Sequence, residues 1–521
     1  MSTSSVPRRS ILRNLALAVA LVGSTTAVCN AAAFAATPKT YTLTIKHLDR
    51  AGHLTGSYAT NVTGISGAGA DEVAHPYDAS GTTTVRLPQG RYLLDSSLST
   101  GDGADGTDWI VQPRLDLDRD TTVTIDARTT APVDVQPPDH LAGFQHGAMF
   151  VRVTQGGAVR ETNLITSSSK LRVAHLGPDA EPGSVKQRFD SYWTTDKGGY
   201  ALGYTFTGPR ALTGLTRHPA PKDLAALQIR GAARPGTAGK ASFDLQPTVG
   251  PTVGVARTLA TPGTATYFVT PGRGTWDITY AVPGAPGKAP NRYSAAGIAV
   301  RAGGKITHTF DNAVFGPLLT GRPGVVRDGN SLNVDVPLLA DGGGHVPSSP
   351  MYASASTTLH RNGVLVGTKT GTPGKAKFTV PQGRATYRLT STVNRTGAPG
   401  AATRVTASWT FTSGAVTGPT SMPVSVVRFS PALSATGTAA ANSTLRVPVT
   451  VLGAASHGRV RSLVVSVSVN GGASWTQVPV ENGAVTIRNP QAGTGVSLRA
   501  KLTDTGGNTL TQTIVDAYRT R

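Results

Sequence analysis

Three short stretches carry the residue types of a nucleophilic serine site. Ser421 lies in "GPTSMP", His146 precedes a glycine, and Asp504 lies in "KLTDTGGN". Such a site needs a base that takes the serine proton and a carboxylate that orients the base, all meeting in space. The serine is followed directly by methionine, proline and a β-branched run, which predicts a strand after a linker. Because Asp504 has the composition of a tight turn, we assign no catalytic residue and expect no enzyme activity.

Carboxylates cluster in two loops. The glycine-rich stretch "GDGADGTDW" places Asp102, Asp105 and Asp108 where they could offer hard oxygens to calcium, although the glutamate and spacing of an EF-hand are missing. The stretch "DEVAHPYD" combines one histidine with three acids: Asp71, Glu72, His75 and Asp78. One histidine among adjacent carboxylates is not a zinc signature, and nothing singles out a carboxylate pair for glycoside hydrolysis. We predict no metal-binding or cofactor-binding residue, and calcium at the first loop stays the alternative.

Several aromatic side chains could stack on sugars or fill a core. They are Trp109, Tyr192, Trp193 and Trp276. Large aromatic rings bury much apolar area, so we expect core packing for each. The stretch "SVNGGASWTQV" resembles a hairpin found in sialidases and many β repeats, in which the tryptophan, here Trp475, packs under the turn. One copy of that hairpin implies no activity.

Apolar residues alternate with polar ones along nearly the whole chain, as in "TYTLTIKHLD" and "SLVVSVSVNGG". Period-two alternation ending at Gly, Pro, Asn or Asp predicts strands. Two-residue hairpin turns are predicted at Asn362-Gly363 and Asn482-Gly483, because both residues of such a turn take positive φ. A helical turn is expected only at 221–229, where proline opens the segment and leucines recur.

A proline–glycine turn followed by an aromatic strand occurs three times, beginning at Leu87, Thr270 and Val380. Such turns are typical of immunoglobulin-like sandwiches. The sequence therefore predicts an all-β protein of serial antiparallel β-sandwich modules, immunoglobulin-like or transthyretin-like. Proline-rich breaks place the modules at 37–131, 132–316 (one sandwich or two), 317–418 and 419–521.

The first 36 residues are typical of an export signal, with three arginines, an apolar run and a small-residue cleavage site. Sec and twin-arginine export both fit, and we expect a secreted, extracellular protein. Cys29 lies in this segment and is the chain's one cysteine, so the mature form would have no disulfide. No later stretch has the 18 or more apolar residues that span a bilayer.

The composition is strongly basic, with 49 Lys and Arg against 29 Asp and Glu, a formal net charge of +20. Removing the three signal arginines leaves about +17. No basic run interleaved with aromatics stands out, so we expect no nucleic-acid partner and no membrane partner. A diffuse positive surface favours anionic cell-wall polymers through long-range attraction.

Several long stretches resemble one known family. They are "HPYDASGTTTVRLPQGRYLLD", "DWIVQPRLDLDRDTTVTIDARTTAPVDV", "VDVPLLADGGGH", "RVTASWTF", "VRFSPAL" and "VSLRAKLTDTGGNTLTQTIVDAYR". Together they are similar to the C-terminal extension of secreted actinobacterial subtilisin-like proteases, particularly those of Streptomyces. The resemblance implies an accessory region here without the protease domain. Subtilisins order their triad Asp, His, Ser, whereas this chain has His146, Ser421, Asp504. The first module also resembles the carboxypeptidase regulatory-like sandwich.

These observations favour a secreted, noncatalytic, monomeric array of sandwiches that binds an extracellular protein or a cell-wall polymer. The alternatives are a subtilase-family serine protease by similarity, a glycan-acting enzyme with a scattered site, and a structural remnant of a protease gene. Two close carboxylates in a cleft would favour the glycan-acting enzyme.

Overall fold

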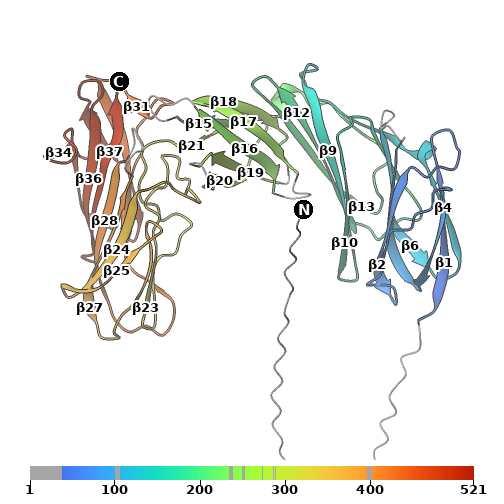
Figure 1. Cartoon of the computed structure of the whole chain (residues 1–521), viewed down its shortest axis with the longest axis horizontal. Coiled ribbons are helices and arrows are strands. Elements are labelled where there is room, and N and C mark those ends of the chain that lie inside the picture. Colours follow the sequence, from blue (N-terminus) through green and yellow to red (C-terminus); the bar gives the residue numbers. More distant parts are fainter. Residues whose placement is uncertain are drawn as a thin grey trace, which may run out of the picture. The chain divides into compact units, whose positions relative to one another are not determined.

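The chain is an all-β protein (Figure 1). The computed structural model describes residues 38–99, 106–233, 239–248, 253–272, 274–284, 287, 289–395 and 402–521. The chain divides into two units, residues 1–39 and 40–521, and the described strands all belong to the second. Within the described residues the only helices are two short 3-10 turns, η1 (Ala127–Thr129) and η2 (Pro221–Asp223). The predicted all-β class with antiparallel β-sandwiches is confirmed, and the predicted export segment lies outside the described residues.

The described residues of the second unit before residue 311 form four sheets. Sheet 1 consists of β4 (Thr82–Pro88), β1 (Thr40–Leu48) and β7 (Thr121–Asp126). Sheet 2 has the order β14 (Leu215–Arg217), β8 (Ala131–Val135), β11 (Leu171–His175), β6 (Thr107–Leu117), β5 (Gly90–Ser99), β2 (Tyr58–Gly67) and β3 (Val73–Ala74). Sheet 3 has the order β10 (Ala158–Thr166), β9 (Gly143–Gln155), β12 (Val185–Thr195), β13 (Gly198–Gly208), β18 (Gly263–Val269), β15 (Ala225–Gly231) and β21 (Lys305–Phe310). Sheet 4 has the order β17 (Val255–Thr261), β16 (Gly239–Pro247), β19 (Trp276–Val282) and β20 (Asn291–Ile298).

Sheets 2 and 3 each contribute to two hydrophobic cores. Successive side chains of a strand point to opposite faces, so Ile110 of β6 packs toward sheet 1 while Trp109 and Val111 pack toward sheet 3. In β13, Leu202 likewise packs toward sheet 2 and Ala201 toward sheet 4. Burial on both faces explains why short apolar runs, such as Trp109-Ile110-Val111 in β6, interrupt the alternation in these strands.

Three further sheets are formed by the described residues from 324 onward. Sheet 5 has the order β26 (Lys375–Thr379), β23 (Ser331–Asp335), β22 (Gly324–Asp328) and β29 (Thr420–Ser421). Sheet 6 has the order β25 (Val364–Thr370), β24 (Ser354–Arg361), β27 (Ala385–Asn394), β28 (Arg404–Ser413), β37 (Thr509–Thr520), β36 (Gly495–Asp504), β33 (Val460–Ser468) and β34 (Thr476–Val478), with β31 (Thr438–Ala439) beside β37. Sheet 7 consists of β30 (Ser425–Phe429), β32 (Thr444–Gly453) and β35 (Ala484–Arg488).

Strand pairing by backbone hydrogen bonds crosses two of the predicted module boundaries. The division into modules stays a prediction. Near 131/132, β8 and β14 complete sheet 2 together with strands of the preceding residues. Near 418/419, β28 pairs with β37, so sheet 6 is continuous and one hydrophobic core serves sheets 5, 6 and 7. Sheet 6 is also bonded across this core to β30. Gln512 exchanges two hydrogen bonds with the backbone of Val427, and Trp409 Nε1 donates to the carbonyl of Ser425.

The predicted turns are confirmed, and the predicted helical segment is mostly wrong. Asn362-Gly363 and Asn482-Gly483 have positive φ throughout, from 47° to 84°. Asn362-Gly363 joins β24 to β25 as a two-residue hairpin. Of the segment 221–229, only η2 is helical and the rest enters β15. There Leu227 and Ile229 alternate into the core between sheets 3 and 4, so tertiary burial overrides the leucine spacing.

Candidate functional site

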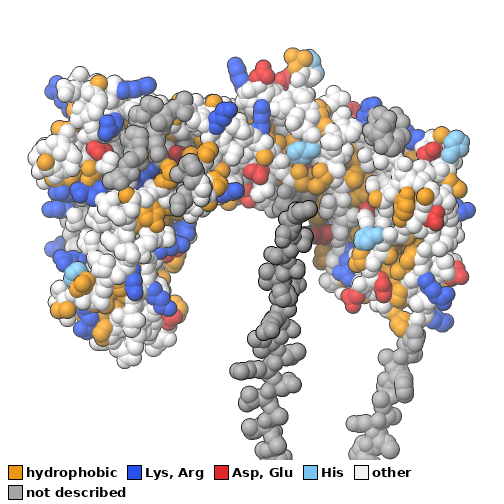
Figure 2. All heavy atoms as spheres, in the orientation of Figure 1, with side chains coloured by type: hydrophobic (Ala, Val, Ile, Leu, Met, Phe, Trp, Pro, Cys, Tyr) orange, Lys and Arg blue, Asp and Glu red, His pale blue; other side chains and the backbone are white. Residues whose placement is uncertain are grey.

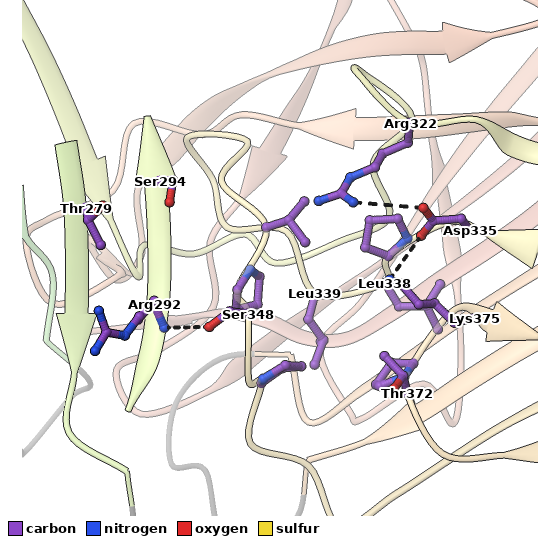
Figure 3. A pocket seen from close by; sticks show the side chains of 15 residues that line it. Thr279, Arg292, Ser294, Arg322, Asp335, Leu338, Leu339, Ser348, Thr372 and Lys375 are labelled. Carbon is purple, nitrogen blue, oxygen red and sulfur yellow. Dashed lines mark hydrogen bonds and ion pairs between the residues drawn. The ribbon is translucent and has the colours of Figure 1, made fainter. Parts of the chain in front are cut away.

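A cleft of about 500 Å³ lies between sheets 4 and 5 (Figure 3), and we call it the junction cleft. Strands β19 and β20 form one wall, and the ends of β23 and β26 with the loops around them form the other. Its lining combines basic and hydroxyl side chains with apolar ones, several of them prolines: Thr279, Arg292, Ser294, Arg322, Asp335, Pro337, Leu338, Leu339, Val346, Pro347, Ser348, Pro350, Thr372, Pro373 and Lys375.

The first wall is held to the loop 346–350 by hydrogen bonds along β20, the edge strand of sheet 4. The amide of Ser348 donates to the carbonyl of Arg292 at 2.8 Å, and the amide of Arg292 donates to Ser348 Oγ at 3.2 Å (Figure 3). The amide of Ser349 also donates to Asn291 Oδ1. The loop therefore occupies a sheet edge whose backbone groups would otherwise lack partners. The guanidinium of Arg292 points away from Ser348 (Figure 3).

The second wall depends on one glycine. Gly374 has φ +76°, and its carbonyl accepts a hydrogen bond from the amide of Val336 at 2.9 Å. A Cβ at this position would lie 1.8 Å from the carbonyl oxygen of Val336. Only glycine allows this close approach, and the approach places Lys375 beside Asp335 across the β23–β26 ladder.

The cleft carries an excess of positive charge. Its lining includes three cations, Arg292, Arg322 and Lys375, and one carboxylate, Asp335, so the net charge is +2. Arg322 and Lys375 lie 3.9 and 4.0 Å from the Asp335 oxygens, too far for good hydrogen bonds (Figure 3). Asp335 is half-buried, and its Oδ1 is a buried oxygen without a hydrogen-bond partner among the described residues, so the two cations compensate its charge only through space and keep their N–H donors for an incoming anion.

The lining residues suit binding rather than bond cleavage. They include no histidine, cysteine or glutamate, and the single carboxylate cannot provide the acid and base pair of a glycosidase. Arginine and lysine recognise carboxylates and phosphates, with arginine able to bind two oxygens at once. The hydroxyls of Ser294 and Thr279 add neutral hydrogen-bonding groups on the β19–β20 wall.

The structure does not bring His146, Ser421 and Asp504 together. They lie in sheets 3, 5 and 6, and among the described residues no hydrogen bond joins any two of them. His146 packs on Tyr192 with ring centroids 4.6 Å apart, and burial lowers its pKa. Asp504 accepts hydrogen bonds from the amide and side chain of Asn508, both at 2.8 Å, so the predicted turn is confirmed.

Ser421 lies on the edge strand β29, exposed, in an apolar groove that His457 also lines. His457 Nδ1 is 2.8 Å from Ser456 Oγ, its neighbour in the chain. No carboxylate is found among the lining residues of this groove, so it lacks the group that would orient the histidine.

Of the three aspartates in the loop where calcium was the alternative, Asp102 and Asp105 lie outside the described residues. Asp108 is buried and engaged by Arg50 at 2.8 Å and Arg172 at 2.6 Å. Thr130 Oγ1 also donates to it. Asp108 is thus the carboxylate that pairs with two arginines in an ion-pair cluster.

Asp108 shares its cleft with a second carboxylate, Asp49. The backbone amide of His53 donates to Asp49 and lowers its pKa, with a smaller lowering contribution from the amide of Ala51. A glycosidase acid needs a raised pKa, so Asp49 does not supply one.

Two of the residues singled out in "DEVAHPYD", His75 and Asp78, have separate partners. His75 Nδ1 is 2.8 Å from Asn61 Oδ1, and Asp78 accepts from the amide of Ser80 at 2.8 Å. In the part of the chain that the structure describes, no group of three or more His, Cys, Asp or Glu side chains is arranged to hold a metal ion.

The aromatic side chains pack mostly as predicted. Trp109, Tyr192 and Trp276 are buried in cores, while Trp193 is half-buried against Phe144. Trp475 packs under its turn, as expected. Its Nε1 donates to the carbonyl of Gly472 at 2.9 Å, and the guanidinium of Arg499 lies 3.9 Å from its ring centroid.

Lys and Arg side chains are scattered over the visible face in Figure 2, with fewer acids between them. This agrees with a diffuse rather than clustered positive charge. None of the helices that the structure describes is long and apolar enough to cross a membrane.

Sequence patterns did not reveal the junction cleft. Its charged residues are far apart in the chain, from Arg292 to Lys375, and lie on both sides of the boundary predicted at 316/317. Each is an ordinary surface residue in its own strand or loop. The one local signal is the glycine before Lys375, which marks a close backbone approach without indicating a ligand.

No family model and no curated protein matches the chain. Among solved structures, similarity is found to the Bacillus anthracis TIE protein, 13% identical with a TM-score of 0.13, covering 52% of this chain and 50% of that one. The match thus spans about half of the TIE protein. A Streptococcal ancillary pilin is 9% identical (TM-score 0.12), and BcpA, the major pilin subunit of Bacillus cereus, is 11% identical (TM-score 0.11); each match covers 52% of this chain and 99% of the pilin. With TM-scores this low, we infer nothing about function from these likenesses.

Proposed function

We propose that the protein is a secreted, noncatalytic binding protein whose junction cleft holds an anionic segment of an extracellular partner. The observation that carries this proposal is the cleft's composition: three cations, one weakly paired carboxylate and several hydroxyls, without a nucleophile and base. The high net charge supports the same conclusion, because a positive surface raises the local concentration of polyanions and their association rate.

The partner is either a cell-wall polymer that carries phosphates or carboxylates, or a protein with an acidic segment. Both present the same chemistry to Arg292, Arg322 and Lys375. The resemblance to the extension of subtilisin-like proteases supports an accessory role beside a secreted protease, and the relationship to that family is itself part of the proposal.

The test measures binding of two fluorescent probes, a ten-residue polyglutamate and a glycerol-phosphate oligomer, with polyglutamine as the neutral control. Charge-assisted hydrogen bonds contribute about 1.5–3 kcal/mol each, so Arg292→Glu or Lys375→Glu should weaken binding at least about tenfold. The matched control is Arg461→Glu on strand β33, an exposed residue outside the cleft with the same change in charge. It should weaken binding less than about twofold.

An equal loss in the control variant would show that net charge, not the cleft, binds the probe, and would contradict the proposal. The noncatalytic part is tested separately with an active-site probe for serine hydrolases. We expect no labelling of the full chain, and labelling at any serine would overturn this part.

A further inference from the structure

Two histidine rings lie close together beside the junction cleft, tilted to one another with their centroids 5.7 Å apart. His308 lies on β21, the edge strand of sheet 3, and His345 lies in the loop that leads into 346–350. The Nδ1 atom of His308 is 3.5 Å from the Nε2 atom of His345. This distance is long for a hydrogen bond, so the pair gains little from that contact alone.

The surroundings of His345 determine which of its nitrogens carries the proton. Both oxygens of Asp341 are 3.1 Å from His345 Nδ1, and this carboxylate is fully buried. It also accepts hydrogen bonds from the amides of His345 at 2.8 Å and Asp311 at 3.0 Å. A carboxylate surrounded by donors requires the proton on His345 Nδ1. In the neutral imidazole, the Nε2 atom is then the one that carries the lone pair, and it lies toward His308.

The spacing of the two nitrogens matches a metal site. Two bonds of about 2.0–2.1 Å in tetrahedral geometry place the ligand nitrogens roughly 3.3 Å apart. Metal-binding histidines almost always donate their other ring N–H to a carboxylate or carbonyl, which orients the ring. Asp341 does this for His345, and the buried ring of Phe310 packs on the same imidazole with centroids 4.3 Å apart.

We propose that His308 Nδ1 and His345 Nε2 bind one divalent transition-metal ion of the zinc type. The described residues bring no third His, Cys, Asp or Glu into a metal-binding group, so water completes the coordination in the isolated protein. Because His345 directly precedes the loop 346–350, the bound ion also ties β21 to the loop that lines the junction cleft.

The test uses the full, tag-free chain with Zn²⁺ in equilibrium dialysis and with Co²⁺ in visible absorption, which reports nitrogen coordination. We expect one site per chain, and at least tenfold weaker binding in His308→Asn and in His345→Asn. The matched control is His140→Asn, because His140 is exposed and lies in a different loop, between β8 and β9; it should bind as the native chain does.

His345 is nearly buried, so its variant can fail to fold, and circular dichroism identifies that outcome. His308 is only half-buried on an edge strand, and its variant then provides the test. Retained Zn²⁺ binding in a folded His308→Asn chain would overturn the proposal, as would a native chain that binds no Zn²⁺. Neither result bears on the binding of the anionic probes.

Discussion

The substitution Gly374→Ala should damage both the local structure and the junction cleft. Gly374 has φ +76°, and the left-handed region costs a residue with a Cβ about 1–2 kcal/mol. The new methyl would lie 1.8 Å from the Val336 carbonyl oxygen, so the backbone must move by more than an ångström. Movement breaks the Val336–Gly374 hydrogen bond, which contributes about 0.5–1.5 kcal/mol. The expected destabilisation is about 1.5–3.5 kcal/mol, confined to this end of sheet 5.

Two control glycines separate the causes. Gly363 has φ +84° with open space around it, so Gly363→Ala measures the conformational cost alone. Gly418 has open space and no positive φ, so Gly418→Ala should have little effect. The assay is hydrogen exchange at the Val336 amide together with polyglutamate affinity. Protection should fall and binding weaken only in Gly374→Ala, whereas indistinguishable behaviour of Gly374→Ala and Gly418→Ala would refute the reasoning.

Two further predictions concern buried polar groups. Burial lowers the pKa of His47 from 6.5 to about 4, opposed by its hydrogen bond to the Gly81 carbonyl. The unfolded chain therefore binds the proton more tightly than the folded chain does. Above pH 6.5 His47 is mostly neutral in both states and the folded chain keeps its full stability, which falls as the pH falls toward 4. Urea unfolding should show that this group lowers the free energy of unfolding by about 2–3 kcal/mol between pH 7 and pH 4.5. The His47→Gln chain should lack this loss, and equal pH dependence of unfolding in the two chains would contradict the role of His47. Gln512→Leu leaves the amide and carbonyl of Val427 without partners, so it should destabilise by about 2–5 kcal/mol. The exposed neighbour Thr511→Val should change stability by less than about 0.5 kcal/mol, and similar unfolding of both variants would contradict the role of Gln512.

Local sequence patterns predicted the features that depend on neighbouring residues. Alternation predicted the strands, and Asn362-Gly363 and Asn482-Gly483 predicted turns that need positive φ. The size of the aromatic side chains predicted core positions, and Trp109, Tyr192 and Trp276 are indeed buried. Each of these properties is encoded within a few residues of the chain.

Features that depend on distant partners were not predicted. The pairing of β28 with β37 joins residues about a hundred positions apart, and no local pattern indicates that two sandwiches share a sheet. The helical turn at 221–229 was predicted from leucine spacing, whereas packing against sheet 4 made most of it a strand. The junction cleft combines strands of two sheets, so its charged residues become neighbours only in the folded chain.

Hydrogen exchange of the full chain, with and without bound polyglutamate, tests the central claim most directly, because it locates the bound segment. We expect added protection in three segments that are separate in sequence and line the junction cleft: 291–294, 346–350 and 372–375. Protection that leaves these segments unchanged and appears elsewhere, or no protection at saturating probe, would contradict the assignment of the cleft as the binding site.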